Sequence, residues 1–280
     1  MRVVKSVDEV RCERRKHQGS CGLVPTMGYL HAGHLSLVQR ARAENDIVCV
    51  SIFVNPTQFG PSEDLSSYPR DLDRDLAALQ AAGVDLVWAP EADDVYPAGY
   101  QTYITVEDVS LPLEGRSRPG HFRGVATVVA KLFNVVQPDR AYFGQKDAQQ
   151  VAVIRRMVSD LNFPLEIVAC PIVRETDGLA LSSRNVYLNP AERAAAPVLR
   201  RALLAAEAAW LAGERDGMEL RAAMMSVLNA EPLAKTEYVS AADPVTLEEL
   251  GVATRGAVLS MAVRMGKARL IDNIVLSHES

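Results

Sequence analysis

Short apolar runs of strand length alternate with amphipathic segments through the first two thirds of this chain, and this alternation strongly constrains its fold. The apolar runs cover residues 21–26, 47–54, 86–89, 141–143 and 165–170. Their apolar residues are continuous rather than alternating, so both faces of each strand are expected to be buried, as in a parallel sheet covered by helices. The sequence therefore predicts an α/β fold with a doubly wound, Rossmann-like parallel sheet.

The segments between these runs have helical periodicity over residues 33–44, 71–82, 125–136 and 148–160. Gly83 stands where one of these helices should stop, and Asp147 stands where another should start. In such sheets ligands bind beyond the carboxyl ends of the strands. The loops that follow Thr26, Val54 and Phe143 are therefore expected to meet at one site.

The composition changes after Leu188, where a second, smaller α+β domain is expected. Asn189, Pro190 and Glu192 form a helix start with a capping box, and Pro197 predicts a kink in the alanine-rich helix that follows. A second helix is expected over 217–229 and strands over 236–241, 258–263 and 270–276. The expected division is a catalytic domain, 1–185, and a lid domain, 186–280. No polar cluster stands out in the second domain, so it is expected to cover the site or to support assembly.

Two histidines, His31 and His34, stand where the first apolar run gives way to a helix, with Gly33 between them. The first turn of a helix presents unpaired N–H groups and the positive end of its dipole, so this position suits a polyphosphate. A metal pair is the alternative. It is less favoured because ligands on one helical face prefer a spacing of four, and no cysteine or third histidine lies nearby.

Two further loops carry polar side chains after apolar runs. Asn55 and Gln58 offer amides that suit a hydroxy acid, although an Asn-Pro turn explains the same residues. In the other loop Lys146 supplies a charge and Asp147 is expected to cap the next helix. Gln150 either completes a capping box with Asp147 or faces the substrate, and the second interpretation is favoured.

The run Ser182-Ser183-Arg184 combines two hydroxyls with a guanidinium, a set that suits terminal phosphates. Residues 113–124 form a glycine-rich, basic run that is either a flap over the site or a solvated loop. The flap is favoured slightly, and His121 within it is taken as structural. The acidic residues that follow the Asn55 loop could assist magnesium, but a solvated helix start is favoured; they are Glu63, Asp64, Asp71, Asp73 and Asp75.

Composition excludes several classes of partner. The 30 basic and 35 acidic residues give a net charge of −5, which disfavours nucleic acid. No apolar run is long enough to cross a bilayer, and residues 1–6 do not resemble a signal peptide, so a cytoplasmic protein is expected. The scattered cysteines are expected to be reduced thiols; they are Cys12, Cys21, Cys49 and Cys170.

Taken in order, these motifs resemble those of the pantothenate synthetase (pantoate–β-alanine ligase) family. The resemblance covers nearly the whole chain, although the first twenty residues fit only loosely. It departs from the family pattern at Tyr29, Ala32, Gln145 and Ala148. The motifs that carry it are Pro25-Thr26-Met27-Gly28 with His31 and His34, Asn55 to Gly60, Tyr68-Pro69-Arg70, Arg118 to Phe122, Phe143 to Gln150, and Ser182 to Asn185.

The resemblance implies a two-step reaction. Pantoate attacks the α-phosphate of ATP to give pantoyl adenylate and pyrophosphate, and the amine of β-alanine then displaces AMP. His34 would be the catalytic proton donor, with His31 and Lys146 beside it, Gln58 would bind pantoate and β-alanine, and Gln150 would bind pantoate. The implied ATP-binding residues are Met27, Gly28, Tyr29, Leu30, His31, Ala32, Gly33, His34, Gly144, Gln145, Lys146, Asp147, Val173, Leu181, Ser182, Ser183 and Arg184.

The same resemblance implies that Mg²⁺ is held mainly by the ATP phosphates, without a separate protein metal site, and that the protein is a homodimer. Two rivals remain at this point. One is another nucleotidyl transferase, including an aminoacyl-tRNA synthetase core, which would need a surface for tRNA and usually a lysine-rich second motif. The other is a nucleotide-binding regulatory module that carries out no turnover.

Overall fold

A six-stranded, fully parallel sheet forms the larger part of the molecule in the computed structural model, which describes residues 1–61, 63 and 65–277. The order of the strands is β1-β4-β3-β2-β5-β6. The predicted α/β, doubly wound, Rossmann-like fold is therefore confirmed. The strands are β1 Arg2–Val4, β2 Cys21–Thr26, β3 Ile47–Ile52, β4 Leu86–Trp88, β5 Arg140–Gly144 and β6 Glu166–Cys170.

Helices cover both faces of this sheet, and successive residues of its central strands enter opposite cores. Leu23 and Cys49 pack on one side of the sheet and Val24 and Val50 on the other, and all four side chains are buried. One face carries α1 Val7–Arg15, α6 His121–Val136 and α7 Ala148–Asp160, and the other carries α2 Ala32–Glu44 and α3 Leu72–Ala81. Shorter turns are η1 Pro56–Gln58, α4 Ala92–Val95, η2 Asp108–Ser110, α5 Glu114–Ser117, η3 Gln145–Asp147 and η4 Ser183–Tyr187.

The strand order reverses between β2 and β5, the two neighbours from which the chain winds outward in opposite directions. A reversal of this kind leaves a crevice at the carboxyl ends of the two strands. The histidine motif follows β2, and the Lys146 turn follows β5. The fold thus brings these two motifs to one crevice.

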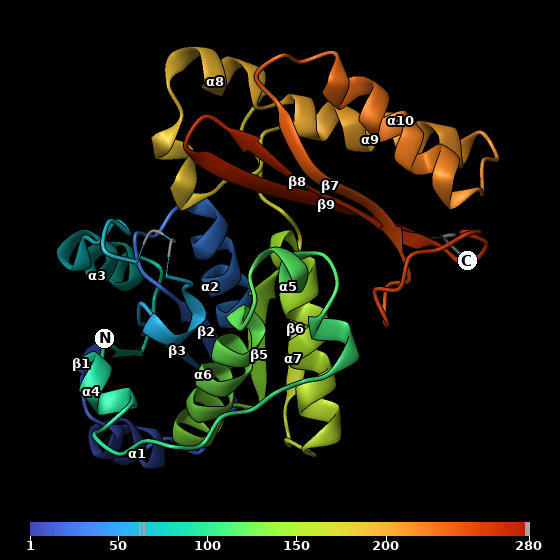
Figure 1. Cartoon of the computed structure of the whole chain (residues 1–280). Coiled ribbons are helices and arrows are strands. Elements are labelled where there is room, and N and C mark those ends of the chain that lie inside the picture. Colours follow the sequence, from blue (N-terminus) through green and yellow to red (C-terminus); the bar gives the residue numbers. More distant parts are fainter. Residues whose placement is uncertain (62, 64, 278–280) are drawn as a thin grey trace.

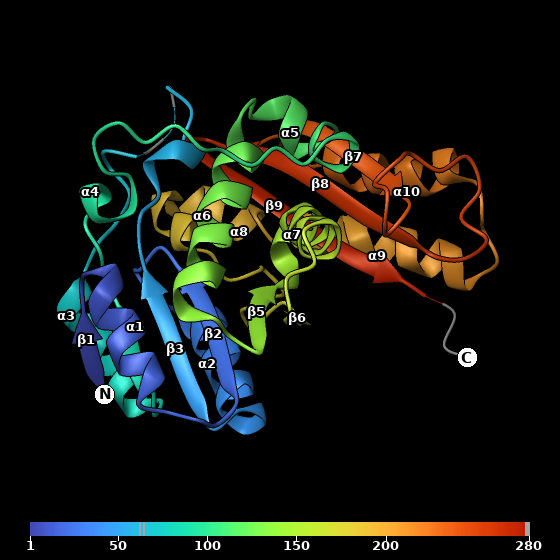
Figure 2. The same cartoon turned by 90° about the horizontal axis from the view of Figure 1, so that it is seen from below.

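A second, three-stranded antiparallel sheet lies across this end of the parallel sheet, with helices on its outer face (Figures 1 and 2). Its core is packed by α9 and α10. The capping box of Asn189 and Glu192 is confirmed, and Pro197 separates two helices where the sequence predicted one kinked helix. The elements are α8 Pro190–Ala195, α9 Val198–Leu211, α10 Gly217–Asn229, β7 Lys235–Ala242, β8 Ala257–Met265 and β9 Ala268–Leu276.

Three local expectations differ from the structure. No element was predicted before residue 21, yet β1 pairs with β4 and α1 begins with a capping box of Ser6 and Glu9. Helix α6 begins at His121 rather than at residue 125, because Gly120 in a left-handed conformation ends the preceding turn just before it. Strand β6 is a partly exposed edge strand rather than a buried one.

All four cysteines are free thiols, of which Cys12 alone is exposed. Among the helices in the described part of the chain, none has both the length and the apolar character needed to span a membrane.

Candidate active site

A cavity of about 240 Å³ lies at the carboxyl ends of β2, β3 and β5. Motifs that are more than a hundred residues apart in the sequence line this cavity. Only the fold shows that they lie close together. The predicted site residues that line it are Met27, His31, Gly33, His34, Gln58, Gly144, Lys146, Asp147, Gln150, Val173, Leu181, Ser182, Ser183 and Arg184.

The loop between β2 and α2 is held by a buried carboxylate. Oδ2 and Oδ1 of Asp75 accept the backbone N–H groups of Tyr29 and Leu30, each at 2.7 Å. Gly28 and Tyr29 both have positive φ angles, +82° and +52°, so the turn adopts a conformation that needs such support. Asp75 is 1 % exposed, so its interpretation as part of a solvated helix start is wrong. Asp71 does cap α3, by accepting the N–H of Arg74, and Asp73 is exposed.

The two imidazoles of the motif lie with ring centroids 4.1 Å apart. Nδ1 of His31 accepts the N–H of Gly33 at 3.1 Å, and Nδ1 of His34 accepts the N–H of His31 at 3.3 Å. A backbone N–H only donates, so the proton of each neutral ring is on Nε2. Both rings can therefore donate an Nε2–H hydrogen bond.

Burial is the main cause of a lowered pKa in both imidazoles, which keeps them uncharged at neutral and mildly acidic pH. It lowers the pKa of His31 to about 4, with a further lowering by Lys146 and Arg74. It lowers the pKa of His34 to about 3, with a further lowering by His31 and Lys146. The positive charge of the cavity therefore comes from its lysine and arginine side chains, and the histidines act as neutral donors.

Lys146 lies in the 3₁₀ turn η3, which runs directly into α7. Asp147 stands at the N-cap position of α7 but makes no side-chain cap, so the predicted cap is wrong, and no capping box with Gln150 forms. Asp147 is itself the last residue of η3 and directly precedes α7, so it belongs to a turn rather than to a free loop before the helix. Gln150 instead lines the cavity, as the favoured interpretation expected.

The amide of Gln58 is oriented by Asn55. Oδ1 of Asn55 accepts the N–H of Thr57, and its Nδ2 donates to the carbonyl of Gly124 at 3.2 Å and to Oε1 of Gln58 at 3.1 Å. A backbone N–H only donates and a carbonyl only accepts, so neither amide can be flipped. The Nε2 of Gln58, 3.0 Å from the Met27 sulfur, is thus the group presented to a ligand. Asn55 both caps the turn and lines the cavity.

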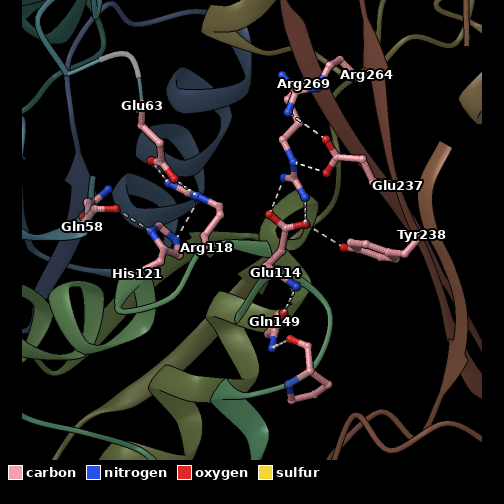
Figure 3. A network of polar contacts seen from close by, with 11 residues as sticks. Gln58, Glu63, Glu114, Arg118, His121, Gln149, Glu237, Tyr238, Arg264 and Arg269 are labelled. Atoms are coloured by element: carbon pink, nitrogen blue, oxygen red, sulfur yellow. Dashed lines mark hydrogen bonds and ion pairs between the residues drawn. The ribbon is translucent and has the colours of Figure 1, made fainter. Parts of the chain in front are cut away.

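A chain of hydrogen bonds holds the backbone of Gln58 from the other side (Figure 3). Nδ1 of His121 lies 2.8 Å from the Gln58 carbonyl, and its Nε2 lies 3.1 Å from Nη1 of Arg118. Burial, followed by the charge of Arg118, lowers the pKa of His121 to about 4. The neutral ring therefore donates from Nδ1 and accepts at Nε2. These bonds support the structural role expected for His121, and the residue also lines the cavity.

Arg118 in turn forms two hydrogen bonds to Glu63, at 2.8 and 2.7 Å (Figure 3). Glu63 is therefore a paired carboxylate rather than part of a solvated helix start, and Asp64 lies outside the described residues. Residues 113–124 form α5 and the first turn of α6, with Glu114 and Phe122 buried. The solvated-loop interpretation of this run is wrong, and its role as a flap stays a prediction.

The Ser-Ser-Arg run lies close to the start of α2. A Cβ placed on Gly33 would lie 3.9 Å from Cβ of Leu181, the residue before the run. Ser182 begins the turn η4, and its hydroxyl accepts the N–H of Arg184 at 3.2 Å. The guanidinium of Arg184 lies 5.9 Å from the ring centre of Tyr68, which also lines the cavity. This segment thus meets the histidine motif across the cavity.

Five predicted ATP-binding residues are not in the cavity wall. Gly28 and Tyr29 form the turn held by Asp75, Leu30 is buried in the core, and Ala32 is the first residue of α2. The side chain of Gln145 points to Asn273 of β9 instead. The other predicted ATP-binding residues line the cavity, whereas these five lie outside its wall.

Helix α6 contributes an apolar wall to the cavity that was not predicted from the sequence. Val125, Val128, Val129 and Leu132 line the cavity at a spacing of three and four residues. That spacing was available in the sequence, but it is equally typical of a helix facing a core. Other missed wall residues are Pro25, Thr26, Leu37, Ser51, Phe53, Phe59, Tyr68, Arg118, Phe143, Pro171 and Ile172.

Comparisons with known proteins agree with this geometry. A sequence model of the family described as pantoate-beta-alanine ligase matches residues 2–275, a range that includes most of the first twenty residues. The chain is 65% identical over 276 residues to a pantothenate synthetase of Roseiflexus sp. (strain RS-1), with 99% of each chain covered. It is 55% identical over 282 residues to that of Geobacter sulfurreducens, with 100% of each covered.

Solved structures give the same result. A crystal structure of pantothenate synthetase from Thermus thermophilus is 53% identical, covers 99% of this chain and 100% of its own, and superposes with a TM-score of 0.95. A pantoate-beta-alanine ligase from Francisella tularensis, described as complexed with beta-gamma ATP and beta-alanine, is 35% identical, with 98% and 97% covered and a TM-score of 0.80.

Proposed function

Because the chain belongs to the pantoate–β-alanine ligase family, we propose that its cavity condenses pantoate with β-alanine at the expense of ATP. The products are pantothenate, AMP and pyrophosphate. One observation carries the assignment of the site. The loops that follow the neighbouring strands β2 and β5 place His31, His34 and Lys146 on one cavity, where the charge of a polyphosphate can be matched.

In the first step, a carboxylate oxygen of pantoate attacks the α-phosphorus of ATP, and the bond from that phosphorus to the bridging oxygen breaks. Lys146 supplies positive charge at the α-phosphate, and His31 and His34 donate Nε2–H hydrogen bonds to its oxygens. Ser182, Ser183 and Arg184 hold the departing pyrophosphate. Preorganised donors of this kind stabilise the charge that develops in the transition state.

In the second step, the amine of β-alanine attacks the acyl carbon of pantoyl adenylate, the bond to the AMP oxygen breaks, and the amine loses a proton. The amide of Gln58 presents a donor to pantoate and later to β-alanine, and Gln150 binds pantoate. The apolar wall of α6 is complementary to the two methyl groups of pantoate. This apolar wall, beside the oriented Gln58 amide, supports a branched hydroxy acid as the substrate.

Mg²⁺ would enter on the phosphates of ATP, where it would neutralise their charge. Within residues 1–61, 63 and 65–277 no group of three histidine, cysteine, aspartate or glutamate side chains is arranged to hold a metal ion. Asp147 is the one carboxylate among the residues that line the cavity in this part of the chain. This donor set fits a metal whose ligands come mainly from the substrate.

The remaining assignments are also proposals. We place the catalytic domain at 1–185 and the lid domain at 186–280, supported by the separate core of the second sheet. We further propose a homodimer in the cytoplasm. Four free thiols suit a reducing compartment, and the family resemblance supports the dimer.

The test is a steady-state assay with ATP, Mg²⁺, pantoate and β-alanine in which AMP and pyrophosphate are followed. Equal formation of AMP and pyrophosphate only when both acids are present supports the ligase. A second assay omits β-alanine and follows exchange of labelled pyrophosphate into ATP, which should depend on pantoate. Product formation with another acceptor, or nucleotide binding without turnover, would overturn the proposal in favour of one of the two rivals.

A further inference from the structure

Strand β9 of the C-terminal sheet makes polar contacts with two segments that line the cavity and with helix α5 beside it, and the mechanism above uses none of them. We propose that Asn273, together with its neighbour Asp272, positions the phosphate-binding walls, so that the C-terminal sheet acts as a fixed brace for catalysis as well as a cover. The inference rests on the proposed function only for the role of Lys146.

Asn273 holds the turn that carries Lys146. Its Nδ2 donates to the backbone carbonyls of Gln145 and Lys146, both at 2.9 Å, and its Oδ1 lies 3.3 Å from Nε2 of Gln145. Carbonyls only accept, so the orientation of this amide is fixed. Asn273 is 3 % exposed, so water cannot readily replace it as a donor. The position of the Lys146 backbone therefore depends on a side chain from the other sheet.

Asp272 holds a second segment of the cavity wall. Its carboxylate, 2 % exposed, forms two hydrogen bonds with Arg174, at 2.7 and 2.9 Å. Arg174 also donates to the carbonyl of Gly178 and pairs with Ala180 in a β-bridge. These contacts close the loop that runs from Val173 to Leu181, both of which line the cavity. Adjacent residues of one strand thus hold two segments of the cavity wall, which follow the neighbouring strands β5 and β6.

A third contact ties β9 to the segment that carries Arg118. Nη1 and Nη2 of Arg269 donate to the buried carboxylate of Glu114 at 2.6 and 2.9 Å, and its Nε donates to Glu237 (Figure 3). The hydroxyl of Tyr238 donates to the same carboxylate at 2.8 Å. Glu114 lies in α5, where its N–H donates to Gln149 of α7. Multiple buried bonds of this kind favour one fixed arrangement of the two sheets.

Sequence reasoning gave the C-terminal domain no polar constellation, and the structure corrects this. Arg269, Asp272 and Asn273 are spread over only five positions of one strand. None of them lies beside a motif in the sequence, so their shared role becomes visible only when the strand is placed against the cavity. A small displacement of a catalytic group is known to cost a large factor in rate, so the brace should be measurable in turnover.

The experiment compares Asn273→Ala and Asn273→Asp with the wild type at a temperature well below the melting point of every variant. Alanine removes both donors, whereas aspartate places a carboxylate oxygen against two carbonyls. We expect kcat for pantoate-dependent pyrophosphate exchange to fall about tenfold for Asn273→Ala and on the order of a hundredfold for Asn273→Asp, as expected for a misplaced catalytic group. The KM for pantoate should change less than twofold.

Asn45→Ala is the matched control. Asn45 is also buried, and it lies between the end of α2 and the start of β3, outside the cavity wall. Its Nδ2 donates to the carbonyl of Ala41 and to the hydroxyl of Tyr142. This variant should lose stability but keep kcat within twofold. Equal kcat losses in Asn45→Ala and Asn273→Ala would show that the effect is general loosening, and would overturn the proposal.

A readout independent of turnover separates this inference from the proposed function. Acylation of Lys146 by an amine-reactive ester, followed by peptide mass spectrometry, measures whether ATP protects that amine. ATP should protect it in the wild type and Asn45→Ala, and protection should fall at least twofold in Asn273→Asp. Unchanged protection and unchanged kcat in both Asn273 variants would overturn the brace. If the wild type shows no turnover but ATP still protects its Lys146 amine, the proposed function is overturned and the inference about Asn273 is not.

Discussion

The hydroxyl of Tyr96 donates a hydrogen bond of 2.9 Å to Oδ1 of Asn55, the side chain that orients Gln58. Tyr96 itself lies outside the cavity wall, at the end of the short helix α4. Burial raises its pKa to about 12, so the hydroxyl keeps its proton at every pH at which the protein would be assayed. A relay of three side chains therefore connects α4 to the amide offered to the substrate.

Tyr96→Phe should raise the KM for pantoate about threefold to tenfold while leaving the KM for ATP unchanged, because one hydrogen bond worth about 1 kcal/mol is lost from the relay. The measurement is initial rate against pantoate at saturating ATP. Tyr100→Phe is the control, since Tyr100 packs edge-on against the Tyr96 ring and is not a partner of Asn55 in the described part of the chain. Equal shifts in both variants would contradict the relay.

Asp75→Asn should weaken ATP binding. The substitution replaces one of the two acceptors of the Tyr29 and Leu30 N–H groups with an amide donor, so one buried N–H is left facing a donor at a cost of about 1–3 kcal/mol. We expect the KM for ATP to rise about tenfold or more and the melting temperature to fall. Asp73→Asn, at an exposed position of the same helix, should change neither. An unchanged KM for ATP in Asp75→Asn would remove the role of this carboxylate.

The sheet could be predicted because each of its central strands is continuously apolar, a pattern that depends only on local sequence. The capping box at Asn189 is local in the same way. Strand β1 was missed because it has three residues and draws its stability from β4, more than eighty residues away. The order of the motifs along the chain was sufficient to predict the family. It does not predict the order of the strands in the sheet, which brings the motifs together.

The candidate site was predictable where a polar or charged side chain directly follows an apolar strand in the sequence, as at His31, His34 and Lys146. It was not predictable where tertiary packing decides the role. Asp75 looks like a solvated acid in a helical first turn, and only the fold buries it against the loop after β2. Asn273 lies about 130 residues from the turn it holds, and nothing in its local sequence distinguishes it from a strand amide exposed to solvent.

Lys146→Ala and His34→Ala should each lower kcat on the order of a hundredfold or more, because each removes a donor aimed at charge that develops in the transition state. The measurement is AMP formation at saturating substrates. Lys267→Ala, at an exposed position in the turn between β8 and β9, is the control for loss of a lysine and should retain full activity. Wild-type rates in both site variants would remove their assigned roles.

Acid should destabilise the fold through its buried histidines. The pKa of His121 is about 4 in the folded protein and about 6.5 when unfolded. The unfolded state therefore binds more protons than the folded state between these two pH values. The contribution of His121 to the free energy of unfolding is fully present above pH 6.5 and is lost as the pH falls toward 4. From this one group the loss between pH 7 and pH 5 is about 2 kcal/mol.

His121→Asn tests this expectation, since the asparagine amide retains a donor for the Gln58 carbonyl but does not titrate. Urea unfolding at pH 7 and pH 5 should show a smaller pH dependence in this variant than in the wild type. A pH dependence that stays the same in His121→Asn would assign the acid sensitivity to other groups.

Gly124→Ala should displace the turn that carries Gln58. A Cβ on Gly124 would lie 2.3 Å from the carbonyl oxygen of Thr57 and 2.7 Å from Cα of Gln58, both backbone atoms that cannot rotate away. Alanine normally stabilises a helix interior by about 1 kcal/mol relative to glycine, but overpacking of this kind costs about 1–3 kcal/mol. We expect a net loss of stability and a raised KM for pantoate, measured by urea unfolding and initial rates. Gly251→Ala is the control, because an added Cβ there meets no atom within 4 Å, and it should preserve both the free energy of unfolding and the KM for pantoate. A Gly124→Ala protein with the wild-type KM would show that η1 can move without disturbing the amide of Gln58.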